Sequence, residues 1–102
     1  MLENINPADI MFLDIETVPL LSSFDNLTPA MQALWEKKSV NFRKDDQTAG
    51  DVYRRAGIYA EFGKIICISV GVLKDKNPYG LRLKSFYGEE EKNILTEYSA
   101  IL

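Results

Sequence analysis

The feature that most limits how this chain can fold is a pair of short, mostly apolar runs, residues 10–16 and 65–73, separated by a long polar stretch. Each run has the length and composition of a β-strand rather than of a helix. The first is almost continuously apolar, which is typical of a strand that is covered on both faces. Residues 81–87 follow a turn-like segment at 74–80 and predict a third strand, paired with the second as an antiparallel hairpin.

Two helix starts lie between the first two strands. Thr28 followed by Pro29 has the pattern of an N-cap and a first helical residue, which predicts a helix to about residue 38. Thr48 and Asp51 have the spacing of a capping box and predict a second helix to about residue 60. With 102 residues, the chain has the length of one small domain or of one piece of a larger one, and its strands and helices predict an α/β fold with helices at about 28–60 between the first two strands.

A third helix is predicted from residue 89 to the end of the chain. Its apolar residues form a single stripe: Ile94, Leu95, Tyr98, Ile101 and Leu102. The stripe continues to the last position without a capping residue, so we expect the chain to be the N-terminal piece of a longer protein. The sheet edge and this stripe would need cover, and self-association into a homo-oligomer is expected.

Composition excludes several kinds of active site. The chain has no histidine and a single cysteine, Cys67, which excludes a Ser-His-Asp triad, a Cys-His pair and a histidine-ligated zinc within it. Cys67 lies in an apolar run and is expected to be a small buried hydrophobe. No segment is long enough to span a bilayer, and the N-terminus lacks the positive region of a secretory signal. A cytoplasmic protein with no membrane partner is therefore expected.

Charge is unevenly distributed along the sequence. Residues 1–36 contain six acidic side chains and no basic one, whereas residues 37–64 contain seven basic and four acidic side chains, a net charge of +3. A basic segment of this kind can contact phosphate groups. A solvated surface of mixed charge is the simpler explanation of the same pattern.

Two acidic residues, Asp14 and Glu16, interrupt the first strand. They are two positions apart, so both side chains leave the same face of the strand. Burying two neighbouring carboxylates is unfavourable unless a cation, basic partners or water relieves them. A cation held by oxygens would be Mg²⁺ or Mn²⁺, and two such ions are suited to phosphodiester hydrolysis. The alternative is that the strand ends near Leu13 and both carboxylates are surface charges.

Two segments of the sequence resemble a known family. Residues 10–17, an apolar run leading into Asp14-Ile15-Glu16-Thr17, resemble the first exonuclease motif of the DnaQ-like 3′–5′ exonucleases. Residues 55–69 are similar to the second strand and its approach in one branch, the exonucleases related to the exonuclease domain of family B DNA polymerases. The resemblance covers nearly the whole chain, with an insertion between the two segments.

The resemblance implies the N-terminal part of a ribonuclease-H-like fold over residues 1–102. This is an α+β mixed sheet that opens with three antiparallel strands, with a helical insertion at about 28–60 and a helix after the third strand. It also implies four acidic ligands for two Mg²⁺ or Mn²⁺ ions. Asp14 and Glu16 match the first two ligands: Asp14 would bridge both ions, and Glu16 would bind the ion that holds the attacking water. Thr17 and Val18 follow the motif directly and would line the site of the terminal nucleotide.

The function that the resemblance implies is a hydrolase, a 3′–5′ exonuclease domain whose partner is nucleic acid, with the 3′ end of single-stranded DNA as the expected substrate. The family's other two aspartates and its water-positioning Tyr or His have no match in the chain. Weak or absent hydrolysis is therefore expected from these residues alone. The alternative is a non-catalytic nucleic-acid-binding or interaction module on the same fold, whose binding would not depend on divalent ions.

Overall fold

The computed structural model describes residues 2–74 and 80–102. The chain divides into two compact units. We call Met1–Glu16 together with Ile65–Leu102 the sheet unit, and Thr17–Lys64 the helical unit. Short 3₁₀ helices are η1 (Leu2–Asn4) and η2 (Pro7–Asp9) in the sheet unit and η3 (Phe24–Asn26) in the helical unit.

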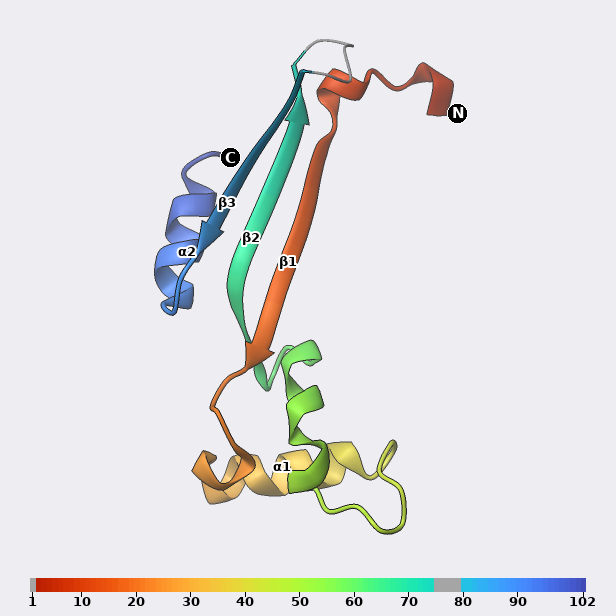
Figure 1. Cartoon of the computed structure of the whole chain (residues 1–102), viewed down its shortest axis with the longest axis vertical. Coiled ribbons are helices and arrows are strands. Elements are labelled where there is room, and N and C mark those ends of the chain that lie inside the picture. Colours follow the sequence, from red (N-terminus) through yellow and green to blue (C-terminus); the bar gives the residue numbers. More distant parts are fainter. Residues whose placement is uncertain (1, 75–79) are drawn as a thin grey trace. The chain divides into compact units, whose positions relative to one another are not determined.

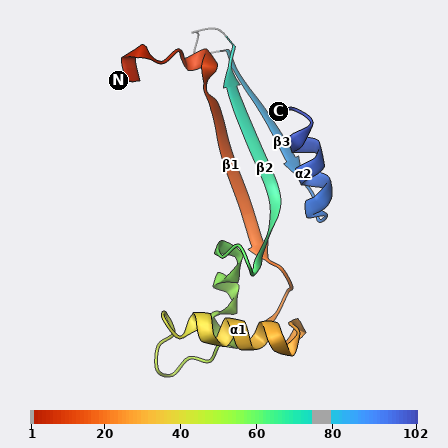
Figure 2. The same ribbon diagram turned by 180° about the vertical axis from the view of Figure 1, so that it is seen from behind.

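The sheet unit is built on three antiparallel strands in the order β1-β2-β3 (Figures 1 and 2). Their bounds are Met11–Pro19 for β1, Gly63–Leu73 for β2 and Leu81–Tyr87 for β3. The β2–β3 register places Cys67 opposite Tyr87 and Leu73 opposite Leu81. The predicted antiparallel hairpin is therefore confirmed, while positions 75–79 of its predicted turn lie outside the described residues.

Helix α2 (Glu91–Ser99) covers one face of the β2–β3 hairpin. The core of the sheet unit consists of four buried side chains: Ile68, Val70, Phe86 and Ile94. Ile68 and Phe86 are opposite each other in the register, and the Tyr98 ring packs edge-on against Phe86 with centroids 6.3 Å apart. Because Ile94 and Tyr98 are one turn apart, they lie on the same side of α2 and face the sheet together.

The predicted third helix is present but shorter than expected. It ends at Ser99 instead of continuing to the last residue. Of the predicted apolar stripe, Ile94 is buried and Tyr98 half-buried, whereas Leu95, Ile101 and Leu102 are exposed. The apolar pattern therefore predicted more contact with the sheet than the structure has. The contact is made by Ile94 and Tyr98, which are one turn apart.

The helical unit contains α1 (Pro29–Ser39), which begins where the sequence predicts. The Thr28 hydroxyl accepts a hydrogen bond from the Met31 N–H at 3.2 Å, which confirms the predicted N-cap. Trp35 has no exposed surface, and its indole N–H donates to the Ala49 carbonyl at 2.8 Å. Around it lies the core of this unit: Leu27, Ala49, Val52, Tyr53, Ala56 and Phe62.

The second predicted helix is a 3₁₀ helix, η4 (Gly50–Ile58), and not an α-helix. Its predicted capping box is present, because the Thr48 N–H donates to the Asp51 carboxylate at 2.9 Å and the Asp51 N–H donates to the Thr48 hydroxyl at 3.2 Å. Near its other end, a Cβ on Gly57 would lie 2.9 Å from the carbonyl carbon of Val18. Glycine is therefore needed there for a close approach of two backbone segments.

The fold is a small α+β arrangement with a three-stranded antiparallel sheet, as the sequence predicts at this level. One expectation about the first strand is wrong: β1 is not covered on both faces, because every residue from Met11 to Thr17 is exposed. In the sheet unit α2 packs against the hairpin of β2 and β3. Among residues 2–74 and 80–102, no helix combines the length and the apolar character that crossing a membrane requires.

Candidate metal centre

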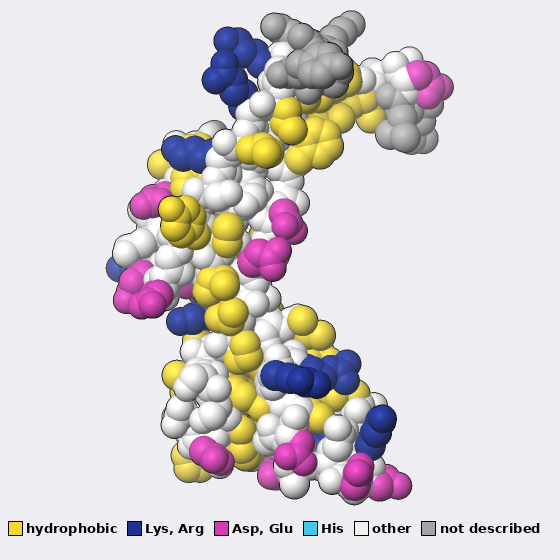
Figure 3. All heavy atoms as spheres, in the orientation of Figure 1, with side chains coloured by type: hydrophobic (Ala, Val, Ile, Leu, Met, Phe, Trp, Pro, Cys, Tyr) yellow, Lys and Arg dark blue, Asp and Glu magenta, His cyan; other side chains and the backbone are white. Residues whose placement is uncertain are grey.

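Asp14 and Glu16 lie on the face of β1 that points away from α2. The orientation follows from Gly71, where an added Cβ would lie 3.7 Å from the Cβ of Phe12. Ile68 and Val70 of β2 are buried beneath α2, so Gly71, at a position of opposite parity, belongs to the open face. Alternation along β1 then places Asp14 and Glu16 on the open face together with Phe12. Figure 3 shows acidic side chains at the surface in the middle of the sheet, with apolar side chains above and below them.

Both carboxylates are exposed to solvent. In the described part of the chain, neither Asp14 nor Glu16 has a hydrogen-bond or ion-pair partner. Of the three ways in which the sequence analysis expects the pair to be relieved (a cation, basic partners or water), the structure shows water, because both carboxylates are exposed. The geometric part of the prediction is confirmed: the two side chains project from one face of one strand, and the strand continues past Leu13.

Asp14 lies at the edge of a shallow hollow of about 160 Å³ on this open face. The floor is apolar and is formed largely by Phe12, Gly71 and Leu83. Ser69 also lines the hollow, and its hydroxyl is 2.8 Å from the hydroxyl of Ser85 on the neighbouring strand. The surroundings of Asp14 thus combine a solvated carboxylate and a hydroxyl pair with an apolar surface.

The donor set is small for a divalent ion. Within the described residues, no three side chains of His, Cys, Asp or Glu are grouped closely enough to hold a metal ion. The Asp14 and Glu16 carboxylates offer oxygen donors of the kind that Mg²⁺ and Mn²⁺ prefer, and the other coordination positions of such an ion would be filled by water. Two carboxylates with many waters make a weak site, so the residues present fit a divalent ion only in part.

Thr17 and Val18, the predicted substrate-lining residues, belong to the helical unit. The Thr17 hydroxyl donates to the Gly57 carbonyl at 2.6 Å, and the half-buried Val18 makes the close backbone approach to Gly57 described above. Both residues therefore have a structural role within the helical unit, where they hold η4 against residues 17–18. Their predicted contact with a terminal nucleotide stays a prediction.

Two polar features were not found from the sequence. Ser69 and Ser85 meet only because β2 and β3 pair in this register, which no local pattern specifies. Cys67, expected to be buried, is half-buried, with its sulfur 3.7 Å from the Ser69 hydroxyl. Cys67 and Ser69 share the open face because they occupy alternate positions of β2, and Ser85 joins them as the partner of Ser69 on β3. The alternation along β2 was the only signal available in the sequence.

Comparisons with known proteins add nothing to this geometry: no family model, no curated protein and no solved structure matches the chain. The resemblance to the DnaQ-like exonucleases therefore depends on the residues of this chain that carry it.

Proposed function

We propose that this chain belongs to a 3′–5′ exonuclease domain with a ribonuclease-H-like fold, which hydrolyses nucleic-acid phosphodiesters with two divalent metal ions. The observation that carries the proposal is the pair of carboxylates, Asp14 and Glu16, side by side on the open face of β1. Further support comes from the order of elements, in which a strand is followed by a helical segment, two antiparallel strands and a helix.

In this proposal, Asp14 and Glu16 hold Mg²⁺ or Mn²⁺ through carboxylate oxygens. Bound ions of this kind activate a water molecule for attack and stabilise the charge that develops on the phosphate. The exposed positions of both carboxylates leave them accessible to a phosphate group and to solvent. Because the described residues supply two acidic ligands where such a site uses four, we expect weak ion binding and weak or absent hydrolysis from this chain alone.

Ion binding tests the proposal directly. Mn²⁺ added to the ¹⁵N-labelled chain should broaden amide signals around Asp14 and Glu16, because a paramagnetic ion relaxes nearby nuclei. The Asp14→Asn variant should lose this local broadening. Asp9→Asn is the matched control, since Asp9 is an exposed acid of the sheet unit outside β1. Broadening that is equal in the wild type and in Asp14→Asn, or absent from β1, would overturn the proposal.

The second candidate function is a nucleic-acid-binding module without catalysis. The concentration of basic side chains in residues 37–64 favours it, since these residues belong to the helical unit and lie outside the carboxylate pair. Such a module would bind single strands in the presence of EDTA and show no Mn²⁺ effect at β1. The titration described above separates the two functions.

A further inference from the structure

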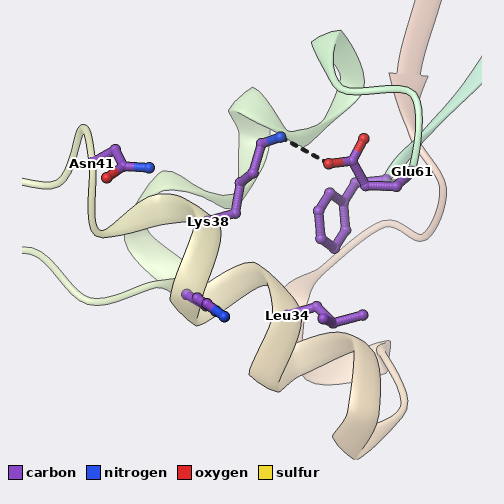
Figure 4. Close-up of a pocket in the computed structure, with 6 residues that line it drawn as sticks. Leu34, Lys38, Asn41 and Glu61 are labelled. Atoms are coloured by element: carbon purple, nitrogen blue, oxygen red, sulfur yellow. Dashed lines mark hydrogen bonds and ion pairs between the residues drawn. The ribbon is translucent and has the colours of Figure 1, made fainter.

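The helical unit has a groove of about 450 Å³ on its surface (Figure 4). The second half of α1 and the turn after it supply Leu34, Lys37, Lys38 and Asn41, and the segment after η4 supplies Glu61 and Phe62. The volume lies within the range of small-ligand sites, and the residues on its two sides are at least twenty positions apart in the sequence. It therefore forms only when the helical unit is folded.

One wall of the groove is fixed by an ion pair. The Lys38 ammonium lies 2.8 Å from a Glu61 carboxylate oxygen and 4.5 Å from the centroid of the Tyr59 ring. Figure 4 shows Lys38 and Glu61 pointing toward each other, with Asn41 on the side of Lys38 away from Glu61. Lys38 neutralises Glu61, the acidic residue that lines the groove. The remaining charge among the lining residues is the positive charge of Lys37.

Two polar groups in the groove are available for a ligand. Within the described residues, neither the Lys37 ammonium nor the Asn41 side-chain amide has a hydrogen-bond or ion-pair partner. Lys37 supplies a positive charge, while the Asn41 amide supplies donors and an acceptor in one plane. Leu34 adds an apolar surface and is 55% exposed. The complementary ligand has an anionic group, a planar edge with donors and acceptors, and an apolar face.

A nucleotide combines these three properties. A peptide fits less well, because peptide sites typically use a strand edge, a long apolar groove or exposed aromatic rings, and the one ring that lines this groove, Phe62, is buried. All lining residues of the groove except Leu34 belong to the basic block, residues 37–64, whose net charge of +3 attracts a polyanion.

We propose that this groove binds one nucleotide of a single-stranded nucleic acid, with a phosphate on Lys37, the edge of the base on Asn41 and an apolar face against Leu34. The site is separate from the carboxylate pair of β1 and uses no divalent ion. The proposal adds a second contact for the nucleic-acid strand that the proposed function takes as substrate. It rests on the proposed function only in taking the ligand to be a nucleic acid.

The test measures binding of fluorescently labelled single-stranded DNA to the whole chain in EDTA, so that the result does not depend on the metal site. Lys37→Ala should weaken binding about fivefold at low salt, and should make the slope of log affinity against log salt shallower by about 0.7. Lys44→Ala is the matched control, because it removes the same charge from an exposed position of the basic block outside the groove.

Asn41→Ala tests the contact with the base. It should weaken binding of the normal strand and leave binding of an abasic strand of equal length unchanged, whereas Lys37→Ala should weaken both. Fluorescence of the buried Trp35 reports that each variant keeps the helical unit folded. Absent binding by the wild type, equal losses in Lys37→Ala and Lys44→Ala, or an Asn41→Ala effect that is the same on both strands would each overturn the proposal. None of these outcomes bears on Mn²⁺ binding at Asp14.

Discussion

The two units of this protein differ in how completely they bury their apolar side chains. In the helical unit the core has seven residues with Trp35 at the centre, and the ring centroids of Phe42, Tyr53, Tyr59 and Phe62 all lie within about 6 Å of that of Trp35. In the sheet unit the core has four residues, and the apolar side chains of β1 remain exposed. The comparison teaches that the unit carrying the candidate metal centre is the less completely packed one.

Removing the central side chain of the helical unit should have the largest effect. Trp35→Ala deletes a fully buried ring and its hydrogen bond to Ala49, which should destabilise the unit by about 3–5 kcal/mol. Chemical denaturation followed by amide NMR signals measures the two units separately. The amide signals of the helical unit should be poorly dispersed or should disappear at a lower denaturant concentration than in the wild type. The signals of β2 and β3 should persist.

The counterpart in the sheet unit is Ile94→Ala, which should cost about 2–4 kcal/mol and act on the hairpin and α2. If either variant abolished the signals of both units at the same denaturant concentration, the chain would fold as one cooperative body and the division into two units would be wrong.

A second comparison uses one glycine from each unit. Gly57→Ala would bring its Cβ to 2.9 Å from the backbone of Val18, which cannot move without disturbing β1, so a loss of about 1–3 kcal/mol is expected. The one close contact of an added Cβ in Gly71→Ala would be with the tip of Leu83 at 2.9 Å, and this side chain is 73% exposed and can rotate away. Its next neighbours, Leu81 and Phe12, lie at ordinary van der Waals distances. Alanine loses less backbone conformational entropy than glycine when the chain folds, so Gly71→Ala should be neutral or slightly stabilising.

Thermal unfolding of both variants measures the difference. The explanation would be contradicted if Gly71→Ala were destabilised or if Gly57→Ala were as stable as the wild type. The stability of these variants would then not depend on whether the added Cβ meets backbone or a flexible side chain.

Local signals in the sequence predicted the elements well, and non-local contacts account for the errors. The N-cap at Thr28 and the capping box of Thr48 and Asp51 are confirmed, because each depends on residues three positions apart. The 3₁₀ character of η4 was missed, and the approach of Gly57 to Val18 near its end is a contact that spans 39 positions of the sequence.

The candidate site shows the same limit. Alternation placed Asp14 and Glu16 on one face of one strand, as the structure has them. The apolar pattern of a strand indicates which side chains could be buried, but it does not indicate which elements pack against the strand. The exposure of β1 could therefore not be predicted from it. The groove of the helical unit was missed because Lys38 and Glu61, which form its ion pair, come together only after folding.

The exposed apolar side chains of β1 predict self-association through the sheet unit. Ile15 is 45% exposed on a strand that forms an edge of the sheet. Ile15→Lys should weaken association about tenfold, because a buried isoleucine contributes roughly 1.5–3 kcal/mol and a charge on an edge strand opposes pairing. Ile58→Lys is the control, since Ile58 is an exposed apolar residue of the helical unit. Sedimentation velocity over a range of concentrations measures both; a wild type that stays monomeric throughout would contradict the prediction.

The smallest expected effect is a pH dependence in the helical unit. A hydrogen bond from Lys38, helped by a backbone hydrogen bond, holds the pKa of Glu61 below its ordinary value of 4.5. Since the pKa is lowered on folding, the contribution of the pair is fully present above the ordinary value and is lost as the pH falls through the lowered one. NMR titration of the Glu61 carboxyl measures this pKa directly. Lys38→Met should raise this pKa toward the ordinary value, with the backbone hydrogen bond still lowering it, whereas Lys37→Met, which removes a charge from the same groove without breaking the pair, should leave it low. Because both partners are exposed, overall stability should barely change, and a large acid-induced loss that Lys38→Met removes would mean that the surface of this unit matters as much as its aromatic core.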